Sequence, residues 1–301
     1  MKRFGFIIAI LIMIFYFIFA PTQALFASRR GLSLWFEQLL PTLLPFSIIS
    51  YIVLASGLFS FHGNGNKRRI SNWEWYVILC GFLFGFPIGS KLTADLYRDG
   101  KISKKNASVL CCFTNNLSPV FVTSAMAAML NLKVHPVLYL VLYGIPFCFG
   151  IASLVFSGEQ APVQKNAAPR FHLNMQIIDA GIINGFETLI KICGYIMMFS
   201  ILSELIKTLP VHNPLMSLLL VGCTEVTNGI SCLAAYSCSD AVKYLLAVLF
   251  LSWNGISGLF QTASVLGMTD LSVRQYLKNK LVLSVIQSGV TGILFFGNFF
   301  I

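Results

Sequence analysis

Polar residues interrupt the apolar segments of this sequence at positions where a purely structural helix would have no use for them. The first interruption is the stretch 85–91 (GFPIGSK), which ends one apolar run. Pro87 and Gly89 are helix breakers, so a new helix is expected to begin near Ser90 with unpaired backbone N–H groups. Such an N-terminus attracts anions. Lys91 either adds a full positive charge there or extends to the membrane surface.

A second interruption divides the apolar segment 108–130. It contains Asn115, Asn116, Ser118 and Pro119 within a few residues. A kink would need the proline alone, whereas amides and a hydroxyl inside a membrane span are costly unless they are hydrogen-bonded. These residues are therefore expected to line a binding site.

The second half of the chain carries an acidic interruption. The apolar segment 214–233 contains Glu225, followed by Thr227 and Asn228. An ionisable residue within such a segment is a candidate functional group by default. Glu225 is expected either to couple transport to H⁺ or Na⁺, or to form a charge pair with Lys91.

The last interruption resembles the second one. At an offset of 139 residues, Asn254 corresponds to Asn115 and Ser257 corresponds to Ser118. Gln261 lies one helical turn beyond Ser257 and is expected to share its face. Matching interruptions in the same order indicate an internal repeat.

The composition places all four interruptions in a membrane. The chain has 301 residues, of which 56% are apolar and 11% are charged, and its mean hydropathy is +0.78. A soluble domain carries roughly 25% charged residues. A soluble enzyme, a nucleic-acid-binding module and a disordered tail are excluded, and an all-α polytopic membrane protein is predicted. No motif for catalysis, nucleotide binding or metal binding is present, so neither an enzymatic activity nor a cofactor is expected.

The repeat defines the expected organisation. Each repeat should begin with an amphipathic interfacial helix, followed by spanning helices, a re-entrant hairpin and a broken helix. The first apolar run is expected to be an uncleaved helix, with a cleaved signal peptide as the alternative. The expected units are an N-terminal transmembrane helix (1–21), a first repeat (22–156) with a hairpin at 75–97, a cytoplasmic linker (157–175), and an inverted second repeat (176–301) with a hairpin at 213–236.

The distribution of Lys and Arg supports the hairpins. If every apolar segment crossed the bilayer, the basic residues would be divided evenly between the two sides. If 75–97 and 213–236 enter and leave on one side, most basic residues lie on the inside, as the positive-inside rule requires. The N-terminus is then cytoplasmic and the C-terminus external. Inverted repeats with broken helices are a recurring architecture of secondary transporters.

Several stretches give the chain a family resemblance. The segments 40–46 (LPTLLPF), 85–95 (GFPIGSKLTAD) and 113–119 (FTNNLSP) resemble the sporulation integral membrane protein family YlbJ/SpoVV. The stretches 224–226 and 254–257 are more distantly similar to concentrative nucleoside transporters. The resemblance implies a nucleoside-recognition (Gate) domain, a place in the membrane around the forespore, and movement of dipicolinate, a small dianion, into the forespore.

The expected function is transport of a small anionic solute, such as dipicolinate, by a secondary transporter or permease. One alternative is an ion-coupled transporter of a nucleoside or another metabolite, and a second is a non-transporting protein of spore-membrane assembly. The expected partners are the lipid bilayer and the solute, with a homo-oligomer left open and nucleic acid excluded. The residues expected to bind the solute are Pro87, Gly89, Ser90, Lys91, Asn115, Asn116, Ser118, Thr227, Asn228, Asn254, Ser257 and Gln261.

Overall fold

Helices make up 83% of the chain in the computed structural model. The structure describes residues 2–58, 70–132, 135–157, 159 and 171–296, and no residue in these ranges belongs to a strand. The prediction of an all-helical membrane protein is confirmed. Most of the expected linker at 157–175 lies outside the described residues.

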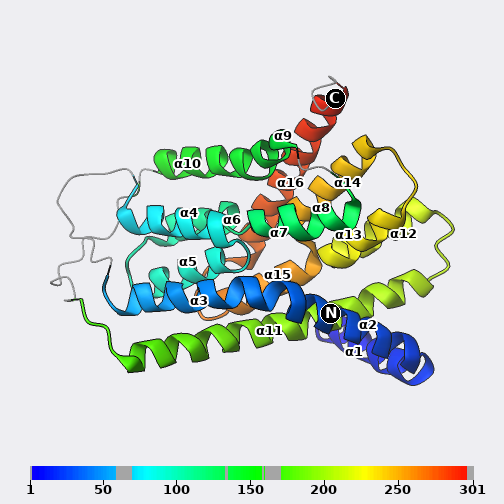
Figure 1. The fold of residues 1–301 in the computed structure, drawn as a ribbon, viewed down its shortest axis with the longest axis horizontal. Helices are drawn as coiled ribbons and strands as arrows, with labels where there is room; N and C mark the ends of the chain where they lie inside the picture. Colours follow the sequence, from blue (N-terminus) through cyan, green and yellow to red (C-terminus); the bar gives the residue numbers. More distant parts are fainter. Residues whose placement is uncertain (1, 59–69, 133–134, 158, 160–170, 297–301) are drawn as a thin grey trace.

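Both halves of the chain repeat one order of elements, namely a long rod, a helical hairpin, a broken helix and a final helix (Figure 1). The first half contains α1 (Lys2–Phe19), α2 (Pro21–Leu34), the π-helical turn η1 (Trp35–Leu39), α3 (Leu40–Ala55), α4 (Asn72–Phe84), α5 (Ile88–Arg98), α6 (Lys104–Phe113), α7 (Pro119–Phe121), η2 (Val122–Met126), α8 (Ala127–Leu130), α9 (Pro136–Tyr139), η3 (Leu140–Gly144) and α10 (Ile145–Ser157). The second half contains α11 (Met175–Thr208), α12 (Pro214–Thr224), α13 (Val226–Ala235), α14 (Asp240–Trp253), α15 (Gly255–Leu266) and α16 (Val273–Phe296).

The long helical rod in each half of the chain differs from the expected pair of an interfacial helix and a spanning helix. Helices α2, η1 and α3 form one continuous rod, and α11 runs antiparallel to it (Figure 1). The 34 residues of α11 extend for about 50 Å, against a hydrocarbon core of about 30 Å. Small residues allow this close pairing, because a Cβ on Gly31 would lie 2.9 Å from Oγ of Ser200. Part of the polar face of each amphipathic segment makes contacts inside the protein, through Arg30 of α2 and Asn184 of α11.

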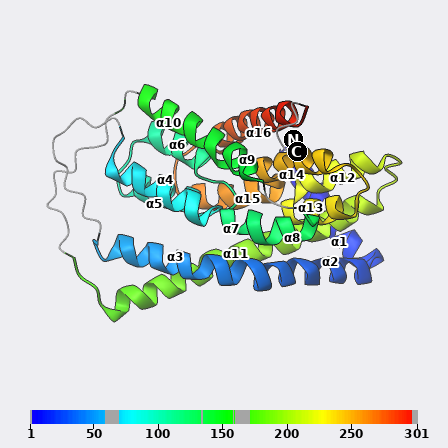
Figure 2. The same cartoon turned by 45° about the horizontal axis from the view of Figure 1, so that its top comes forward.

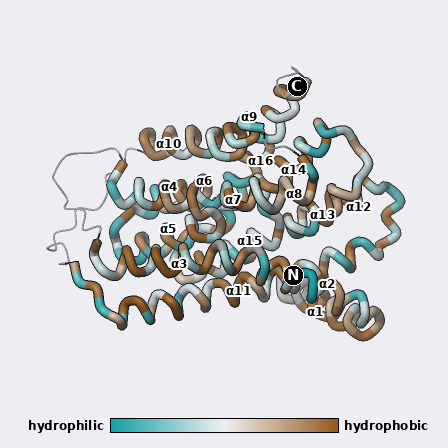
Figure 3. The backbone as a smooth tube through the Cα atoms, in the orientation of Figure 1, coloured by the Kyte–Doolittle hydropathy of each residue, from teal (hydrophilic) through white to brown (hydrophobic). Residues whose placement is uncertain are grey.

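The hairpins and broken helices lie between two outer layers. Helices α3 and α11 cover one side, and α10 and α16 cover the other (Figure 2). Apolar residues dominate the outer helices (Figure 3), and an apolar outer surface suits contact with lipid tails.

Within the described ranges, four segments meet the length and apolarity that a membrane span requires, if one bent pair is included. The continuous candidates are Pro136–Ser157, Met175–Thr208 and Asp240–Leu266. The fourth is the pair Ile10–Phe19 and Pro21–Glu37, which is bent by 112°. The N-terminal helix therefore turns sharply into the first rod.

Polar contacts gather several connecting segments at one end of the bundle. Lys104 forms an ion pair with Asp270 at 2.6 Å, and Nζ of Lys105 donates to the backbone oxygen of Ser157 at 2.7 Å. The hydroxyl of Tyr97 also donates to Asp270, at 2.7 Å. The hydrogen bonds from Lys104 and Tyr97 hold the pKa of Asp270 below its usual value. These contacts, made by Lys104 and Lys105, join the start of α6 to the loop before α16 and to the end of α10, and we call this end of the bundle the basic end.

Candidate functional site

The tip of the first hairpin packs directly on the first helix break. The N–H of Phe86 donates to the backbone oxygen of Asn116 at 2.6 Å. Gly85 has a φ of 72°, and a Cβ at this position would lie 2.4 Å from the N of Ser118. A Cβ on Gly89 would lie 2.4 Å from the backbone oxygen of Thr114. Glycine is therefore required at both positions, and these contacts fix α4, α5 and the break as one unit.

The tip of the second hairpin is closed by its own carboxylate. Glu225 is the N-cap of α13 and accepts from the backbone N of Thr227 at 3.1 Å and of Asn228 at 2.7 Å. Its oxygens also accept from the Thr227 hydroxyl and, at 2.8 Å, from Nδ2 of Asn228. All four donors belong to the first turn of α13. The alternative pairing of Glu225 with Lys91 is not found.

The two helix breaks meet in the interior. Asn254 is in the left-handed conformation, with a φ of 66°, between α14 and α15. Its Nδ2 donates to the backbone oxygen of Asn115 at 2.9 Å. Since a carbonyl oxygen can only accept, this bond fixes the orientation of the amide. The Oδ1 of Asn254 is then buried without a hydrogen-bond partner. An unsatisfied buried acceptor of this kind calls for a ligand or a water molecule.

A small cavity of about 50 Å³ lies where the hairpin tips and the breaks converge. We call it the central cavity. It lies against both hairpin tips, both breaks, the first rod and α11, so elements from both halves of the chain contribute to one site. Its walls include six of the residues predicted from the sequence, namely Pro87, Glu225, Thr227, Asn254, Ser257 and Gln261.

A second cavity, of about 150 Å³, lies beside the central cavity toward the basic end. We call it the basic-end cavity. The two share Pro87, Ile192 and Gln261 as wall residues. The wall carries an excess of cations, so an anion is favoured over a cation in this space. Its charged residues are three cations, Lys91, Arg98 and Lys191, and two carboxylates, Asp95 and Glu187.

Lys91 extends from α5 across the basic-end cavity to α11. Its Nζ donates to Oδ1 of Asn184 and, at 2.8 Å, to Oγ1 of Thr188. Both partners are neutral, and no carboxylate among the described residues forms an ion pair with Lys91. Its charge is therefore available to a bound anion.

A third cavity, of about 370 Å³, adjoins the central cavity on the side of α7 and η2. It shares Phe86, Leu117 and Phe121 with the central cavity, and its remaining wall includes Glu37 and Ser118. The central cavity thus adjoins two larger cavities.

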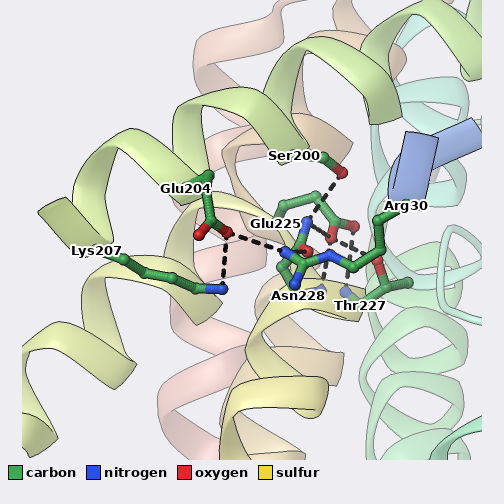
Figure 4. A network of polar contacts seen from close by, with 7 residues as sticks. All are labelled: Arg30, Ser200, Glu204, Lys207, Glu225, Thr227 and Asn228. Atoms are coloured by element: carbon green, nitrogen blue, oxygen red, sulfur yellow. Dashed lines mark hydrogen bonds and ion pairs between the residues drawn. The ribbon is translucent and has the colours of Figure 1, made fainter. Parts of the chain in front are cut away.

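An arginine that the sequence analysis did not single out joins the first rod to the second hairpin. Arg30 of α2 donates to Oδ1 of Asn228 and lies 3.6 Å from Glu204 of α11 (Figure 4). Glu204 also pairs with Lys207 at 3.1 Å, and Asn228 donates to Ser200 at 3.0 Å. The Arg30 network connects three elements that are distant in the sequence.

Removing this arginine tests the connection. Arg30→Met is expected to lower the free energy of unfolding by about 1–3 kcal/mol, because the hydrogen bond is charge-assisted and Oδ1 of Asn228 loses this donor. Thermal melting in detergent measures the loss. Arg29→Met removes an exposed neighbouring arginine and should change the melting temperature little. Equal losses in the two variants would contradict the role of the network.

The remaining predicted residues lie around the central cavity rather than in its wall. Ser90 is buried and donates to the backbone oxygen of Pro87 at 2.9 Å, whereas Ser118 caps α7. Asn115 and Asn116 are buried in the first break. The sequence analysis did not single out Lys280. Helix α16 begins at Val273, so Lys280 lies two turns inside the helix and is buried.

The described residues show no site for a metal ion. Nowhere among them do three His, Cys, Asp or Glu side chains come together. The polar groups of the central and basic-end cavities are instead amides, hydroxyls, carboxylates and ammonium groups, which bind small polar solutes by hydrogen bonds and charge.

Comparison with known proteins gives one relative of most of the chain. The sporulation integral membrane protein YlbJ of Bacillus subtilis is 25% identical over 309 aligned positions, which cover 88% of this chain and 76% of that protein. No family model matches, so the nucleoside-recognition domain stays a prediction, and no solved structure gives a significant match. The chain is thus an all-helical, polytopic membrane protein, and its similarity to YlbJ supports a membrane role in sporulation.

Proposed function

We propose that this protein is a secondary transporter or permease for a small anionic solute. The observation that carries the proposal is the central cavity, formed by two hairpin tips and a helix break and adjoining the cation-rich basic-end cavity. Non-helical backbone at membrane depth is tolerated where it is buried in protein or lines a watery cavity. Transporters with broken helices place their solutes at such a junction.

The two hairpins offer unequal helix N-termini to a solute. The N-terminus of α13 already carries the carboxylate of Glu225. The N-terminus of α5 follows Pro87 and receives no hydrogen bond from a capping side chain. A free helix N-terminus beside the ammonium of Lys91 favours a carboxylate of the solute. An anion is therefore expected to bind on the side of the first hairpin.

The size of the central cavity indicates a closed state. About 50 Å³ holds only about four water molecules. Passage of a ring-shaped solute requires the hairpin tips and breaks to separate, which fits alternating access around a fixed site. The flanking cavities are the spaces into which the solute is released.

The solute we favour is dipicolinate, moved into the forespore during sporulation. Its support is the relative named as a sporulation membrane protein, together with the excess of positive charge in the basic-end cavity. The forespore-surrounding membrane, with a cytoplasmic N-terminus and an external C-terminus, is part of the same proposal.

A second candidate is an ion-coupled transporter of a nucleoside or another neutral metabolite. The observation in its favour is that two amide oxygens of residues in the central cavity wall, Oδ1 of Asn254 and Oε1 of Gln261, are buried without a hydrogen-bond partner. A solute rich in hydroxyl and N–H groups would satisfy them.

Uptake by purified protein in liposomes separates the candidates. Radiolabelled dipicolinate should accumulate, and excess nucleoside should not compete. Lys91→Ala is expected to reduce the initial rate by about tenfold or more, since one charge-assisted contact contributes about 1.5–3 kcal/mol. Lys105→Ala removes an exposed lysine at the same end, outside the cavity walls, and should leave uptake unchanged.

The outcomes are distinct. Competition by nucleosides without uptake of dipicolinate supports the second candidate. Uptake that is equal in the wild type and in Lys91→Ala removes Lys91 from the site. A deletion strain whose spores hold normal dipicolinate, but have disturbed membranes, supports a role in assembly instead of transport.

A further inference from the structure

A lysine lies in the protein interior beside the first helix break, without a counter-ion. Lys280 of α16 is 2% exposed, and it forms no ion pair with any carboxylate of the described ranges. Its Nζ donates to the backbone oxygen of Asn115 at 3.0 Å and to Oδ1 of Asn116 at 2.9 Å. A buried charge is costly unless it is well solvated by protein groups. Here two neutral oxygens take the place of a carboxylate.

The two oxygens lie where a helix has just ended. Helix α6 stops at Phe113, and the chain from Thr114 to Ser118 is not helical. A helix C-terminus carries partial negative charge, and carbonyls freed at such an end are groups that coordinate a monovalent cation in broken-helix transporters. The backbone oxygen of Asn115 also accepts from Asn254, so this position joins both breaks.

The two oxygens that Lys280 contacts are of the chemical kind that binds cations. The oxygens that it contacts belong to amide groups, and amide oxygens are ordinary ligands of alkali cations as well as of ammonium groups. The amide of Asn116 is oriented with Nδ2 on the backbone oxygen of Phe113 at 2.6 Å, which leaves Oδ1 facing Lys280. The oxygen cradle is therefore set by the break itself.

We infer that the first helix break forms a site for a monovalent cation, and that the ammonium of Lys280 is its covalently attached occupant. The site is filled without an ion from solution, so this break takes no part in coupling to Na⁺. This consequence rests on the proposed transport function, whereas the cation site itself can be tested without any solute. If transport is ion-coupled, the coupling group lies in the other half, at Glu225.

Emptying the site tests the inference. Lys280→Ala removes the ammonium and leaves space beside the two oxygens. In detergent with N-methylglucamine chloride, its melting temperature is expected to fall several degrees below that of the wild type. Methylammonium chloride or NaCl at equal ionic strength should restore part of the loss in a saturable way. The melting temperature of the wild type should not respond to this exchange of cations.

A matched variant and a second measurement keep the test decisive. Lys278→Ala removes an exposed lysine of the same helix and should show neither the loss nor the recovery. If Lys280→Ala is not recovered in folded form, methylammonium throughout purification should restore its yield. No loss of melting temperature, or a loss that no small cation reverses, overturns the inference. If no solute is taken up by the wild type, the proposed function fails while the melting result still decides the cation site.

Discussion

Glu225→Gln is expected to lower the free energy of unfolding by about 2–3 kcal/mol and to reduce solute uptake strongly. The carboxylate accepts four hydrogen bonds from the first turn of α13, and glutamine can accept with only one of its two terminal atoms. The side-chain N–H₂ of the glutamine would lie against N–H or O–H donors of Thr227 or Asn228, with which it cannot form a hydrogen bond. The negative charge at the helix N-terminus would also be lost.

Two variants separate the cap from a coupling role. Glu225→Asp keeps the charge and a good N-capping residue, so most of the stability should be retained. Asp240→Asn makes the same chemical change at an exposed helix N-terminus and should cost little. Melting temperature and liposome uptake are measured for each. If Glu225→Gln melts like the wild type but loses only the dependence of uptake on an H⁺ or Na⁺ gradient, Glu225 is a coupling group and not primarily a cap.

Gly85→Ala is expected to destabilise the first hairpin by several kcal/mol. The backbone at this position, with a φ of 72° and a ψ of −161°, costs about 1–3 kcal/mol for a residue with a Cβ, and the Cβ would lie 2.4 Å from the backbone N of Ser118. Overpacking against backbone adds about 1–3 kcal/mol. Because Ser118 belongs to the first break, the central cavity should also be deformed.

Gly100 provides the matched control for this prediction. It has a φ of 69°, but a Cβ there would meet nothing within 4 Å. Gly100→Ala therefore measures the cost of a Cβ at a positive φ without any steric contact, and a clearly larger loss of melting temperature in Gly85→Ala is expected from the contact with the break. If the two variants melt at the same temperature, the close packing of hairpin and break does not contribute to stability.

Much of the site could be predicted because helix breakers act locally. The prolines, glycines and amides near Pro87, Asn115, Glu225 and Asn254 interrupt helices in the structure, as their types and positions indicate. The start of α5 was misplaced by two residues, at Ser90 instead of Ile88. The partners of these groups are separated from them by long stretches of chain, so local patterns could not identify them.

The amphipathic segments illustrate the limit of periodicity. A polar stripe on a helix predicts two different environments, a membrane surface or the polar interior of another element. In α2, Arg30 faces protein and reaches Asn228 in the other half of the chain, whereas the neighbouring Arg29 is exposed. No property of the segment itself distinguishes these environments.

The sequence by itself determined that this is a helical membrane protein with repeated interruptions, because composition and helix breaking depend on residue type and near neighbours. Only the tertiary structure decided which groups meet. It placed Lys91 against Asn184, closed Glu225 onto its own helix, and brought Lys280 to Asn115, 165 residues away. The physical reason is that a buried polar group takes the partner that packing brings within about 3 Å, and packing is a property of the whole chain.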